Sequence, residues 1–248
     1  MKDYQLNYAA DRPSLYDKKT REGRAFRMIK TLADFYGVIK LKDLKVLDIG
    51  SSTGIIDNVL SYKFKQVTGT DIDEQAIKFA SKNFNHKNLR FKVEDAMNLS
   101  FPANSFDVVI CAQVYEHVPD PKKLFSEIYR VLKPDGVCYL AALNKLWPIE
   151  PHYNLPFLAW LPKKIANLYI QITGKASSYY ETPKSYWQLR NLTRKFTLID
   201  YTPKILRNPN KFGYNDTLPN NLMARSITWI FSPLSRILAP TFFWILIK

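Results

Sequence analysis

The chain has 248 residues, 46% of them hydrophobic and 23% charged, which excludes extensive disorder and favours one elaborated domain over two. Its formal net charge of +14 is unevenly distributed, because residues 151–248 hold 13 Lys+Arg against 3 Asp+Glu whereas residues 1–150 hold 23 against 19. The asymmetry predicts an anionic partner, such as a membrane surface, a phosphorylated substrate or nucleic acid, although solvated lysines alone could also produce it.

The first predicted element is a basic, amphipathic helix over residues 18–36. From residue 45 onward, short apolar runs alternate with segments of helical period, which is the pattern of βα units around a parallel sheet. We predict strands over 45–49, 66–70, 89–93, 107–112 and 137–143, helices over 53–63, 74–83 and 121–132, and a turn at 134–136.

The alternation of predicted strands and helices ends after residue 143. Residues 144–195 are rich in Pro, Trp and Tyr and predict an inserted cap, followed by a strand over 196–206, an apolar helix over 220–238 and a last strand over 241–247. The expected fold is α/β, with a mostly parallel seven-stranded sheet and helices on both faces. We expect one domain over 1–248. Residues 1–44 would form a helical segment, 45–143 a ligand-binding core, and 144–248 the cap, a region that contacts a second ligand, and the last strands.

The cysteines and the N-terminal residues bear on the compartment. Cys111 and Cys138 lie inside apolar runs, where a thiol behaves as a small hydrophobe. Their spacing suggests neither a disulfide framework nor a zinc site. Residues 1–12 lack the apolar core of a signal peptide. We therefore expect a cytoplasmic protein.

The strongest motif is VLDIGSSTG at residues 46–54, an apolar strand that leads into a turn and a helix. Gly50 allows a sharp turn and Gly54 a close approach of ligand and backbone, at the edge where open parallel sheets bind ligands. A dinucleotide fingerprint, G-x-G-x-x-G, is not matched, because Ser52 stands in the place of its middle glycine. Asp48 would repel a pyrophosphate but suits a cationic ammonium or sulfonium. The motif therefore favours S-adenosylmethionine over NAD.

The motif resembles the first signature of class I S-adenosylmethionine-dependent methyltransferases, and GTDID (69–73), EDA (94–96) and LKPDG (132–136) follow in that family's order. The resemblance covers residues 40–145. It implies a Rossmann-like class I methyltransferase fold, S-adenosylmethionine as cofactor and enzymatic activity.

The resemblance also implies roles for single residues. Asp71 would accept hydrogen bonds from both ribose hydroxyls, unless it merely caps the next helix. Ile72 would pack on the adenine, and Asp95 would receive the adenine amino group, unless it is only a turn residue. The expected cofactor-binding residues are Asp48, Gly50, Ser51, Gly54, Asp71, Ile72, Asp95, Ala96 and Gln113.

Residues 113–121, QVYEHVPDP, resemble the E-x-x-E-H-V-P-D-P run of O-methyltransferases that act on ubiquinone precursors. In those relatives the carboxylates and the histidine are linked to a divalent metal, but Gln113 replaces the first carboxylate here, so we predict no metal. His117 is the candidate general base, since its reference pKa lies near neutrality, and Glu116 is the second candidate catalytic residue. Alternatively, His117 only starts a helix and packs locally.

Residues 144–240 are expected to shape the acceptor site. They combine apolar and aromatic side chains with basic ones, as interfacial helices do. We expect a small, glycan or lipid-linked acceptor, methylated at oxygen, and peripheral association with an anionic membrane surface, although the same residues could simply cover the sheet. The candidate acceptor-binding residues are Tyr16, Tyr115, His152, Tyr153 and Tyr180.

Two other classes of function stay open. A nucleic-acid methyltransferase would use the basic C-terminal part on phosphates. Enzymes that methylate base amino groups carry an Asn/Asp-Pro-Pro-aromatic run after the fourth strand, where this chain has AQVY (112–115), so nucleic acid is disfavoured as a partner. A binding module without catalysis is disfavoured by the three carboxylates at 48, 71 and 95. No feature of the sequence specifies an oligomeric state.

Overall fold

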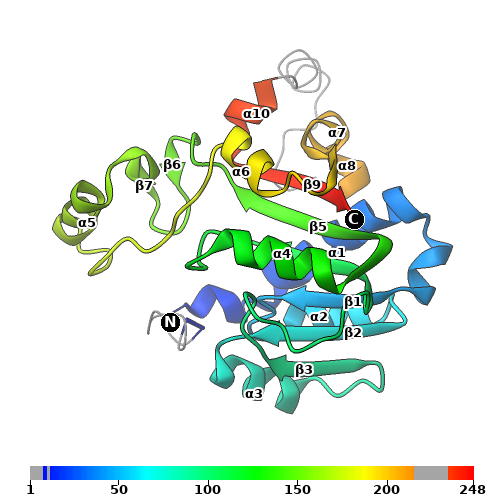
Figure 1. Ribbon diagram of the computed structural model, residues 1–248. Coiled ribbons are helices and arrows are strands. Elements are labelled where there is room, and N and C mark those ends of the chain that lie inside the picture. The colour runs from blue at the N-terminus through cyan, green and yellow to red at the C-terminus, as the bar shows by residue number, and fades with distance from the viewer. Residues whose placement is uncertain (1–7, 10–11, 215–233) are drawn as a thin grey trace.

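A central sheet with helices on both faces dominates the computed structural model, which describes residues 8–9, 12–214 and 234–248 (Figure 1). The sheet has seven strands in the order β3-β2-β1-β4-β5-β9-β8. Strand β9 pairs antiparallel with both β5 and β8, and the other pairs are parallel, so the predicted mostly parallel sheet is confirmed. The strands are β1 (Lys45–Ile49), β2 (Gln66–Asp71), β3 (Leu89–Val93), β4 (Phe106–Ala112), β5 (Leu132–Leu143), β8 (Thr197–Asp200) and β9 (Thr241–Ile247).

One face of the sheet is covered by α1, α2, α7 and α8. Helix α1 has the predicted bounds, Lys18–Tyr36, because the Asp17 carboxylate caps its first turn and Gly37, with φ 84°, ends it. Leu32 on this helix is fully buried and belongs to the cluster that fills the space against β1, β4 and β5. The other three helices are α2 (Ile55–Ser61), α7 (Thr202–Arg207) and α8 (Pro209–Phe212).

The opposite face is covered by α4 (Pro121–Val131), in front of the sheet in Figure 1, and by α6 (Tyr186–Leu192). Asp120 caps α4 and Pro121 occupies its first turn, which fixes its start at the predicted residue. The apolar stripe of α4 packs against β1, β4, β5 and β9 through a second core cluster. Helix α3 (Glu74–Asn83) packs against β2 and β3. Two cores thus hold the carboxyl ends of β1, β2 and β4 in place.

The predicted cap leaves the sheet after β5 and protrudes on the left of Figure 1. It consists of β6 (Ile149–Glu150), β7 (Leu155–Pro156), the 3-10 helix η4 (Leu158–Trp160) and α5 (Lys163–Ile172). A bridge between Asn144 and Lys184 closes its base. The cap has its own small core of Leu155, Leu158, Ala166, Ile170 and Tyr179.

The predicted bounds differ most from the structure at two places. The strand expected over 196–206 ends at Asp200, because Pro203 starts α7 and the Asp200 carboxylate accepts the N–H of Thr202. The residues expected to form a turn at 134–136 lie within β5, which begins at Leu132, and Asp135 bends the strand with a φ of 60°. The register between β4 and β5 shifts at this point.

The helix predicted over 220–238 lies outside the described residues except for α10 (Ser235–Leu238).

Cys111 and Cys138 are free and buried in β4 and β5 as expected, and burial raises the pKa of both thiols. Two 3-10 helices flank α1, namely η2 (Pro13–Tyr16) and η3 (Ile39–Asp43). None of the helices described here is both long and apolar enough to cross a bilayer.

Candidate cofactor and acceptor site

A cavity of about 320 Å³ lies at the carboxyl ends of β1, β2 and β4 and extends to the base of the cap. Its walls also include the loop after β3 and the start of the described N-terminal segment. This is the edge at which parallel sheets bind ligands. Eight of the predicted site residues line this cavity: Gly50, Asp71, Ile72, Asp95, Ala96, Gln113, His117 and His152.

Gly50 brings the main chain close to the cavity. Its φ of 79° and the N–H groups of Gly50 and Ser51, which both donate to the carbonyl of Thr70, define a tight turn after β1. A Cβ on Gly50 would lie 2.5 Å from Cγ2 of Val114, so no other residue fits there without a shift. The turn leaves a concave backbone surface of the kind that a nucleoside can approach.

The Asp71 carboxylate is positioned by two backbone donors. It accepts the N–H groups of Ser52 at 2.9 Å and Asp73 at 3.0 Å. Burial raises its pKa despite these hydrogen bonds. The cap of α3 is Asp73, whose carboxylate accepts the N–H groups of Gln75 and Ala76. Asp71 therefore does not serve as the helix cap that the sequence left as an alternative.

Asp95 and Ala96 line the same cavity from the loop after β3. One Asp95 oxygen accepts the N–H of Met97 at 2.8 Å, so the side chain also stabilises its own turn. The neighbouring Glu94 carboxylate is bound by the hydroxyl and N–H of Ser100 and by Lys92. Ile72 supplies an apolar surface beside these polar groups.

Three of the expected cofactor-binding residues do not line this cavity. Ser51 is fully buried, and Ser52 faces the cavity instead. Gly54 is tightly packed, since a Cβ there would lie 2.7 Å from Ala80 Cβ and from Phe91 Cζ. Asp48 is 4% exposed and lines a neighbouring cavity.

The neighbouring cavity, which we call the second cavity, has a volume of about 330 Å³. It lies on the α1 face of the sheet, between α1, α7 and the start of β9, and is partly apolar. The two cavities meet at a shared wall formed by Arg21, Arg24, Gly50, Ala112 and Gln113. The methionine end of a cofactor bound along Gly50 would lie at this wall.

Opposite charges gather at the shared wall. Burial raises the pKa of Asp48 to about 7, Arg21 lowers it and Asp71 raises it further. Arg21 is 6% exposed and donates to the carbonyl of Ser51 at 3.4 Å, and its Nε has no hydrogen-bond partner among the described residues. An ammonium and a carboxylate on one ligand would match Asp48 and Arg21. These residues fit the amino-acid end of S-adenosylmethionine.

Sequence analysis missed Arg21. The helix over 18–36 was recognised as basic, and basic residues on an amphipathic helix normally face water. The available signal was the spacing of Arg21, Arg24 and Arg27 on a single face, three residues apart. That face turned out to point toward the sheet rather than away from it.

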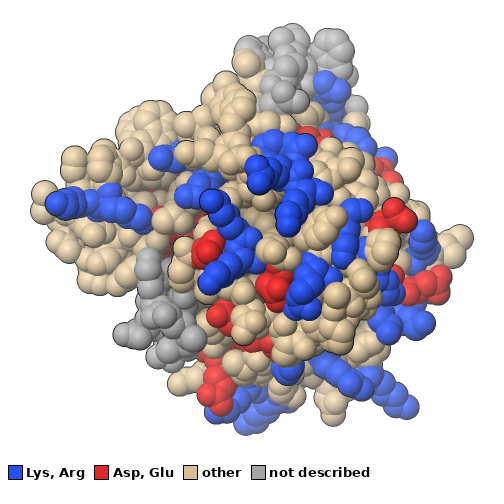
Figure 2. All heavy atoms as spheres, in the orientation of Figure 1, with Lys and Arg blue, Asp and Glu red and all other residues tan. Residues whose placement is uncertain are grey.

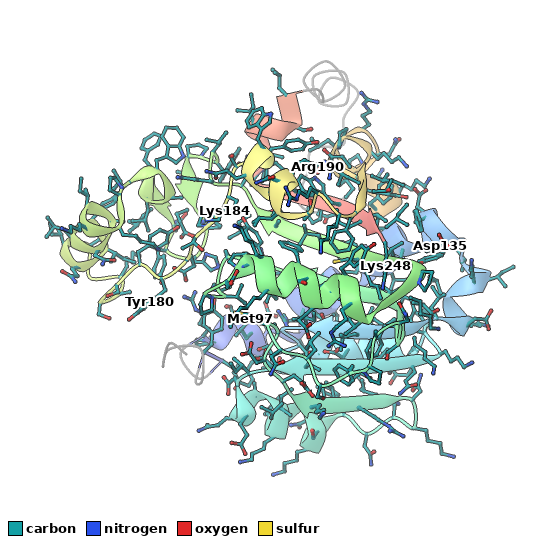
Figure 3. The ribbon with its side chains drawn as sticks, in the orientation of Figure 1. Met97, Asp135, Tyr180, Lys184, Arg190 and Lys248 are labelled. Atoms are coloured by element: carbon teal, nitrogen blue, oxygen red, sulfur yellow. The ribbon has the colours of Figure 1, made fainter. Side chains whose placement is uncertain are left out.

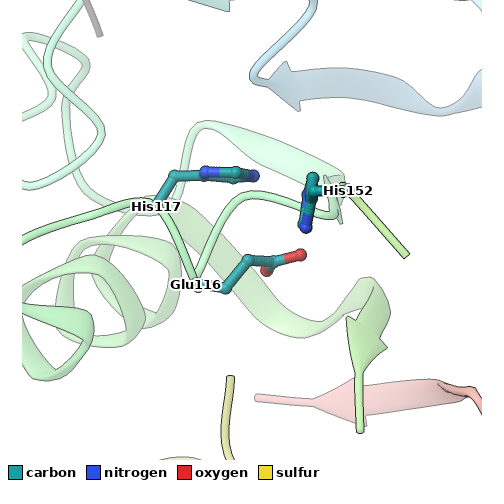
Figure 4. A group of neighbouring side chains, drawn as sticks. All are labelled: Glu116, His117 and His152. Atoms are coloured by element: carbon teal, nitrogen blue, oxygen red, sulfur yellow. The ribbon is translucent and has the colours of Figure 1, made fainter. Parts of the chain in front are cut away.

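A polar cluster closes the cap end of the first cavity (Figure 4). The carboxylate of Glu116 and the imidazoles of His117 and His152 offer atoms that all lie within 4.8 Å of one another. Glu116 is 1% exposed, and neither carboxylate oxygen has a hydrogen-bond partner among the described residues. His152 Nδ1 lies 2.7 Å from Oε1 of Glu150.

Burial dominates the titration of this cluster. It raises the pKa of Glu116 to about 7 and lowers that of His117 to about 3, so His117 is neutral. Burial alone would lower the pKa of His152, but its hydrogen bond with Glu150 raises it. His152 is thus the more basic imidazole.

The cluster also has the composition of a cation site. A carboxylate and two imidazoles, one of them oriented by a second carboxylate, are a donor set that divalent transition metals use. The sequence analysis predicted no metal, because Gln113 interrupts the motif and nothing in the spacing brings His152 of the cap to residue 116. The folded cap supplies the third ligand group.

Four of the predicted acceptor-binding tyrosines lie elsewhere. Tyr115 is fully buried, and its hydroxyl donates to the carbonyl of Leu143 and accepts the N–H of Lys184, so it fastens the base of the cap. Tyr16 packs its ring edge-on against Phe79.

Tyr153 and Tyr180 both belong to the cap and do not line the cavity. The Tyr153 hydroxyl donates to Glu181 at 3.3 Å. Figure 3 shows Tyr180 on the segment that returns from α5 to the sheet. Of the predicted acceptor residues, only His152 lines the cavity, where it is joined by Tyr8, Arg12 and Pro151.

The core of the chain is similar to known methyltransferases. Residues 47–140 match the family model described as a methyltransferase domain. The ubiquinone biosynthesis O-methyltransferase of Idiomarina loihiensis is 33% identical over 126 residues, which are 48% of this chain and 51% of that protein. The chain therefore spans about half the length of such curated relatives.

Solved structures share the fold over nearly the whole chain. A chain of the complex between the Haloferax volcanii Trm112 methyltransferase activator and a methyltransferase is 18% identical, with a TM-score of 0.62 over 100% of this chain and 98% of that one. An S-adenosylmethionine-dependent methyltransferase from Mesorhizobium loti gives a TM-score of 0.55 at 14% identity, over 84% and 93% of the two chains. Residues 47–140 thus match a methyltransferase domain, and the chain has the fold of these solved methyltransferase structures.

Proposed function

We propose that the protein transfers the methyl group of S-adenosylmethionine to an oxygen of a small or lipid-like acceptor. The observation that carries this proposal is the convergence of Asp71, Asp95 and Gly50 on one cavity at the carboxyl edge of the sheet. Two carboxylates and a bare stretch of backbone suit a nucleoside whose ribose and base present hydrogen-bond donors.

Each part of the cofactor has a matching group. Asp71 would accept from the ribose hydroxyls, Asp95 from the adenine amino group, and Ile72 and Ala96 would flank the ring. Asp48 would face the ammonium group and Arg21 the carboxylate of the methionine part. When bound, the sulfonium supplies an already activated methyl group, so the protein has to align the acceptor and exclude water.

An oxygen nucleophile must lose its proton, and the cluster at the cap supplies candidate bases. His152 is the stronger base of the two histidines and is oriented by Glu150. His117 is neutral and lines the same cavity, so it would orient the acceptor hydroxyl. Glu116 lies next to both imidazoles (Figure 4). We therefore assign proton removal to His152 rather than to His117, the residue that the motif favoured. Relatives named as O-methyltransferases support oxygen as the methylated atom.

The cap supports a lipid-like acceptor. On α5, Ile165, Leu168 and Ile172 are 52%, 57% and 75% exposed and lie on one side of the helix, and Trp160 is 48% exposed nearby. Exposed lysines, among them Lys164, flank this apolar surface. Figure 2 shows Lys and Arg side chains on a largely tan cap. We propose that this surface of α5, the α5 patch, rests on an anionic membrane and that the acceptor reaches the site from there.

Binding of the cofactor is the first test. Replacing Asp71 with Asn removes the negative charge but keeps one acceptor for the N–H groups of Ser52 and Asp73. Loss of two charge-assisted hydrogen bonds should weaken S-adenosylmethionine binding by roughly a hundredfold or more in calorimetry. Asp107→Asn is the matched control, because Asp107 also accepts a backbone N–H, from Lys45, but at the opposite edge of the sheet. Equal affinity in all three proteins would refute the assignment.

Transfer is the second test. Labelled S-adenosylmethionine is incubated with the protein and a cell extract, which is then separated into lipid, glycan, protein and RNA fractions. We expect base-stable label in the lipid fraction, and much less label with Asp71→Asn. Label in RNA would instead identify a nucleic-acid methyltransferase, and tight cofactor binding with no label in any fraction would identify a binding module.

A further inference from the structure

The second cavity has no role in holding the adenosine part of the cofactor. Its floor is the α1 face of the sheet, with Tyr139 of β5 and Phe243 of β9, and Ile205 of α7 forms part of a side wall. Its volume of about 330 Å³ lies within the range of small-molecule sites. It shares with the first cavity the wall at which the methyl group would be presented.

Two arginines of α1 line this cavity without an ionised partner among the described residues. Nη1 of Arg24 donates to the amide oxygen of Gln113 at 2.9 Å. Nε of Arg27 donates to the carbonyl of Gly213 at 3.0 Å, and its guanidinium lies 4.5 Å from the centre of the Tyr214 ring. All three partners are neutral, and no described carboxylate lies within ion-pair distance of either guanidinium.

The electrostatics of the cavity favour an anion. Burial lowers the pKa of Arg24, and the neighbouring Arg27 lowers it further, so the two cations destabilise each other. Asp48 is the one carboxylate that lines the described part of the cavity, and its own burial weakens its ionisation. Two half-buried guanidiniums beside apolar walls are a costly arrangement that an anionic ligand would relieve.

We infer that the second cavity binds the acceptor through an anionic group, a carboxylate or a phosphate monoester, held by Arg24 and Arg27. The apolar body of the acceptor packs on Tyr139, Ile205 and Phe243, and the hydroxyl to be methylated points to the shared wall at Gly50 and Gln113. This inference rests on the proposed methyl transfer and adds the chemical class of the acceptor. Guanidinium forks suit both anions, because each presents two oxygens in one plane.

The test measures the binding of simple probes to protein saturated with S-adenosylhomocysteine. Octanoate carries the carboxylate, octyl phosphate the phosphate, and 1-octanol has the same chain without charge. The test variant is the double substitution Arg24→Gln and Arg27→Gln. The matched control is Lys19→Gln and Lys30→Gln, which removes the same charge from exposed positions of the same helix.

We expect the double arginine variant to bind octanoate, octyl phosphate or both about tenfold or more weakly than the wild type. The double lysine variant should change the affinity for these anions by less than about twofold. Binding of 1-octanol should be equal in all proteins. The tighter anion identifies whether a carboxylate or a phosphate is preferred. An equal loss of anion affinity in both double variants would show that only the net charge matters and would overturn the inference. Anion affinity that is unchanged in the arginine variant would overturn it as well.

Two controls separate the possible failures. If the wild-type protein does not bind S-adenosylhomocysteine, the proposed function fails, whereas normal cofactor binding without arginine-dependent anion binding overturns only the acceptor class. Arg27 also holds the Gly213 carbonyl, so the double variant could lose stability. Arg24→Gln alone keeps an amide donor for Gln113 and should still weaken the anions, with an unchanged circular dichroism spectrum.

Discussion

Asp48 is the most strongly constrained carboxylate of the site. It is buried beside Asp57, whose pKa burial and Asp48 itself raise well above the usual value. Arg21 offsets part of this cost. Such a group is costly in the free protein and becomes useful only when a cationic ligand part faces it. Its burial therefore lowers the stability of the free protein, and we propose that a bound cationic group would offset this cost.

Asp48 should make the free protein less stable as the pH rises. Its pKa is raised to about 7 in the folded state, so its contribution to stability is present in full below about pH 4 and is lost as the pH rises through about 7. Over this window the free energy of unfolding of the wild type should fall by roughly 2–4 kcal/mol from this group. Asp48→Asn should have a flatter profile in urea unfolding at pH 5, 6, 7 and 8. A variant with the same slope as the wild type would contradict the assignment.

His152 should act on the chemical step. His152→Gln is expected to lower kcat by about 10²-fold or more while the affinity for S-adenosylmethionine stays the same, because the imidazole lies at the cap end of the cavity. His86→Gln is the matched control, since His86 contacts Asn58 outside the cavity. If His117→Gln lowers kcat and His152→Gln does not, the two histidines exchange roles.

At the residue scale, the sequence predicted the carboxylates that line the first cavity better than the candidate acceptor residues. Asp71 and Asp95 follow strands directly, so their place at the sheet edge depends only on the βα pattern. Tyr115, in contrast, lies in the right loop but turns inward to bind Leu143 and Lys184. Which way a loop side chain points depends on long-range packing, which no local pattern encodes.

Helix α2 begins directly after Gly54, a glycine that the packing around it requires. A Cβ on Gly54 would meet Ala80 and Phe91, and its φ of 74° is left-handed. Gly54→Ala should therefore destabilise the protein by about 2–4 kcal/mol, from overpacking and backbone strain. Gly23→Ala is the control within α1, where a Cβ meets nothing within 4 Å, and it should stabilise by about 0.5–1 kcal/mol. Urea unfolding of both variants measures the two changes in the free energy of unfolding. If Gly54→Ala leaves this free energy unchanged, Ala80 and Phe91 can move to make room for the Cβ.

At the element scale, capped and strictly periodic segments were predictable to the residue. Helices 18–36 and 74–83 and the strand 241–247 match their observed bounds. Asp17, Asp73 and Pro240 mark where they start, and Gly37 marks the end of the first helix. The strand predicted over 196–206 was too long, because the apolar residues of α7 continue its hydrophobic run and only Pro203 marks the change. The run of apolar residues thus continues past Asp200, but the backbone changes there from strand to helix.

At the scale of the whole molecule, the uneven charge and the α5 patch should act together. Liposomes with anionic lipids should carry the wild type upward in flotation at low salt, less so at high salt. Ile165→Glu with Ile172→Glu should abolish flotation. Val38→Glu with Ile39→Glu is the matched control, since these residues are 73% and 88% exposed at the start of η3, away from the cap. Failure of the wild type to float at low salt, or equal loss in both variants, would exclude the α5 patch as the contact.

The position of β9 has a consequence for how the molecule is made. This strand is the last one described along the chain, yet it lies between β5 and β8 and is the pairing partner of both. While a ribosome is still delivering the cap, β5 ends the nascent sheet with its backbone hydrogen-bonding groups exposed, an edge prone to wrong pairing. Strand β8 cannot protect that edge, because its register is set by β9. The sheet closes only when β9 emerges, so chaperone protection during synthesis should matter most at β5.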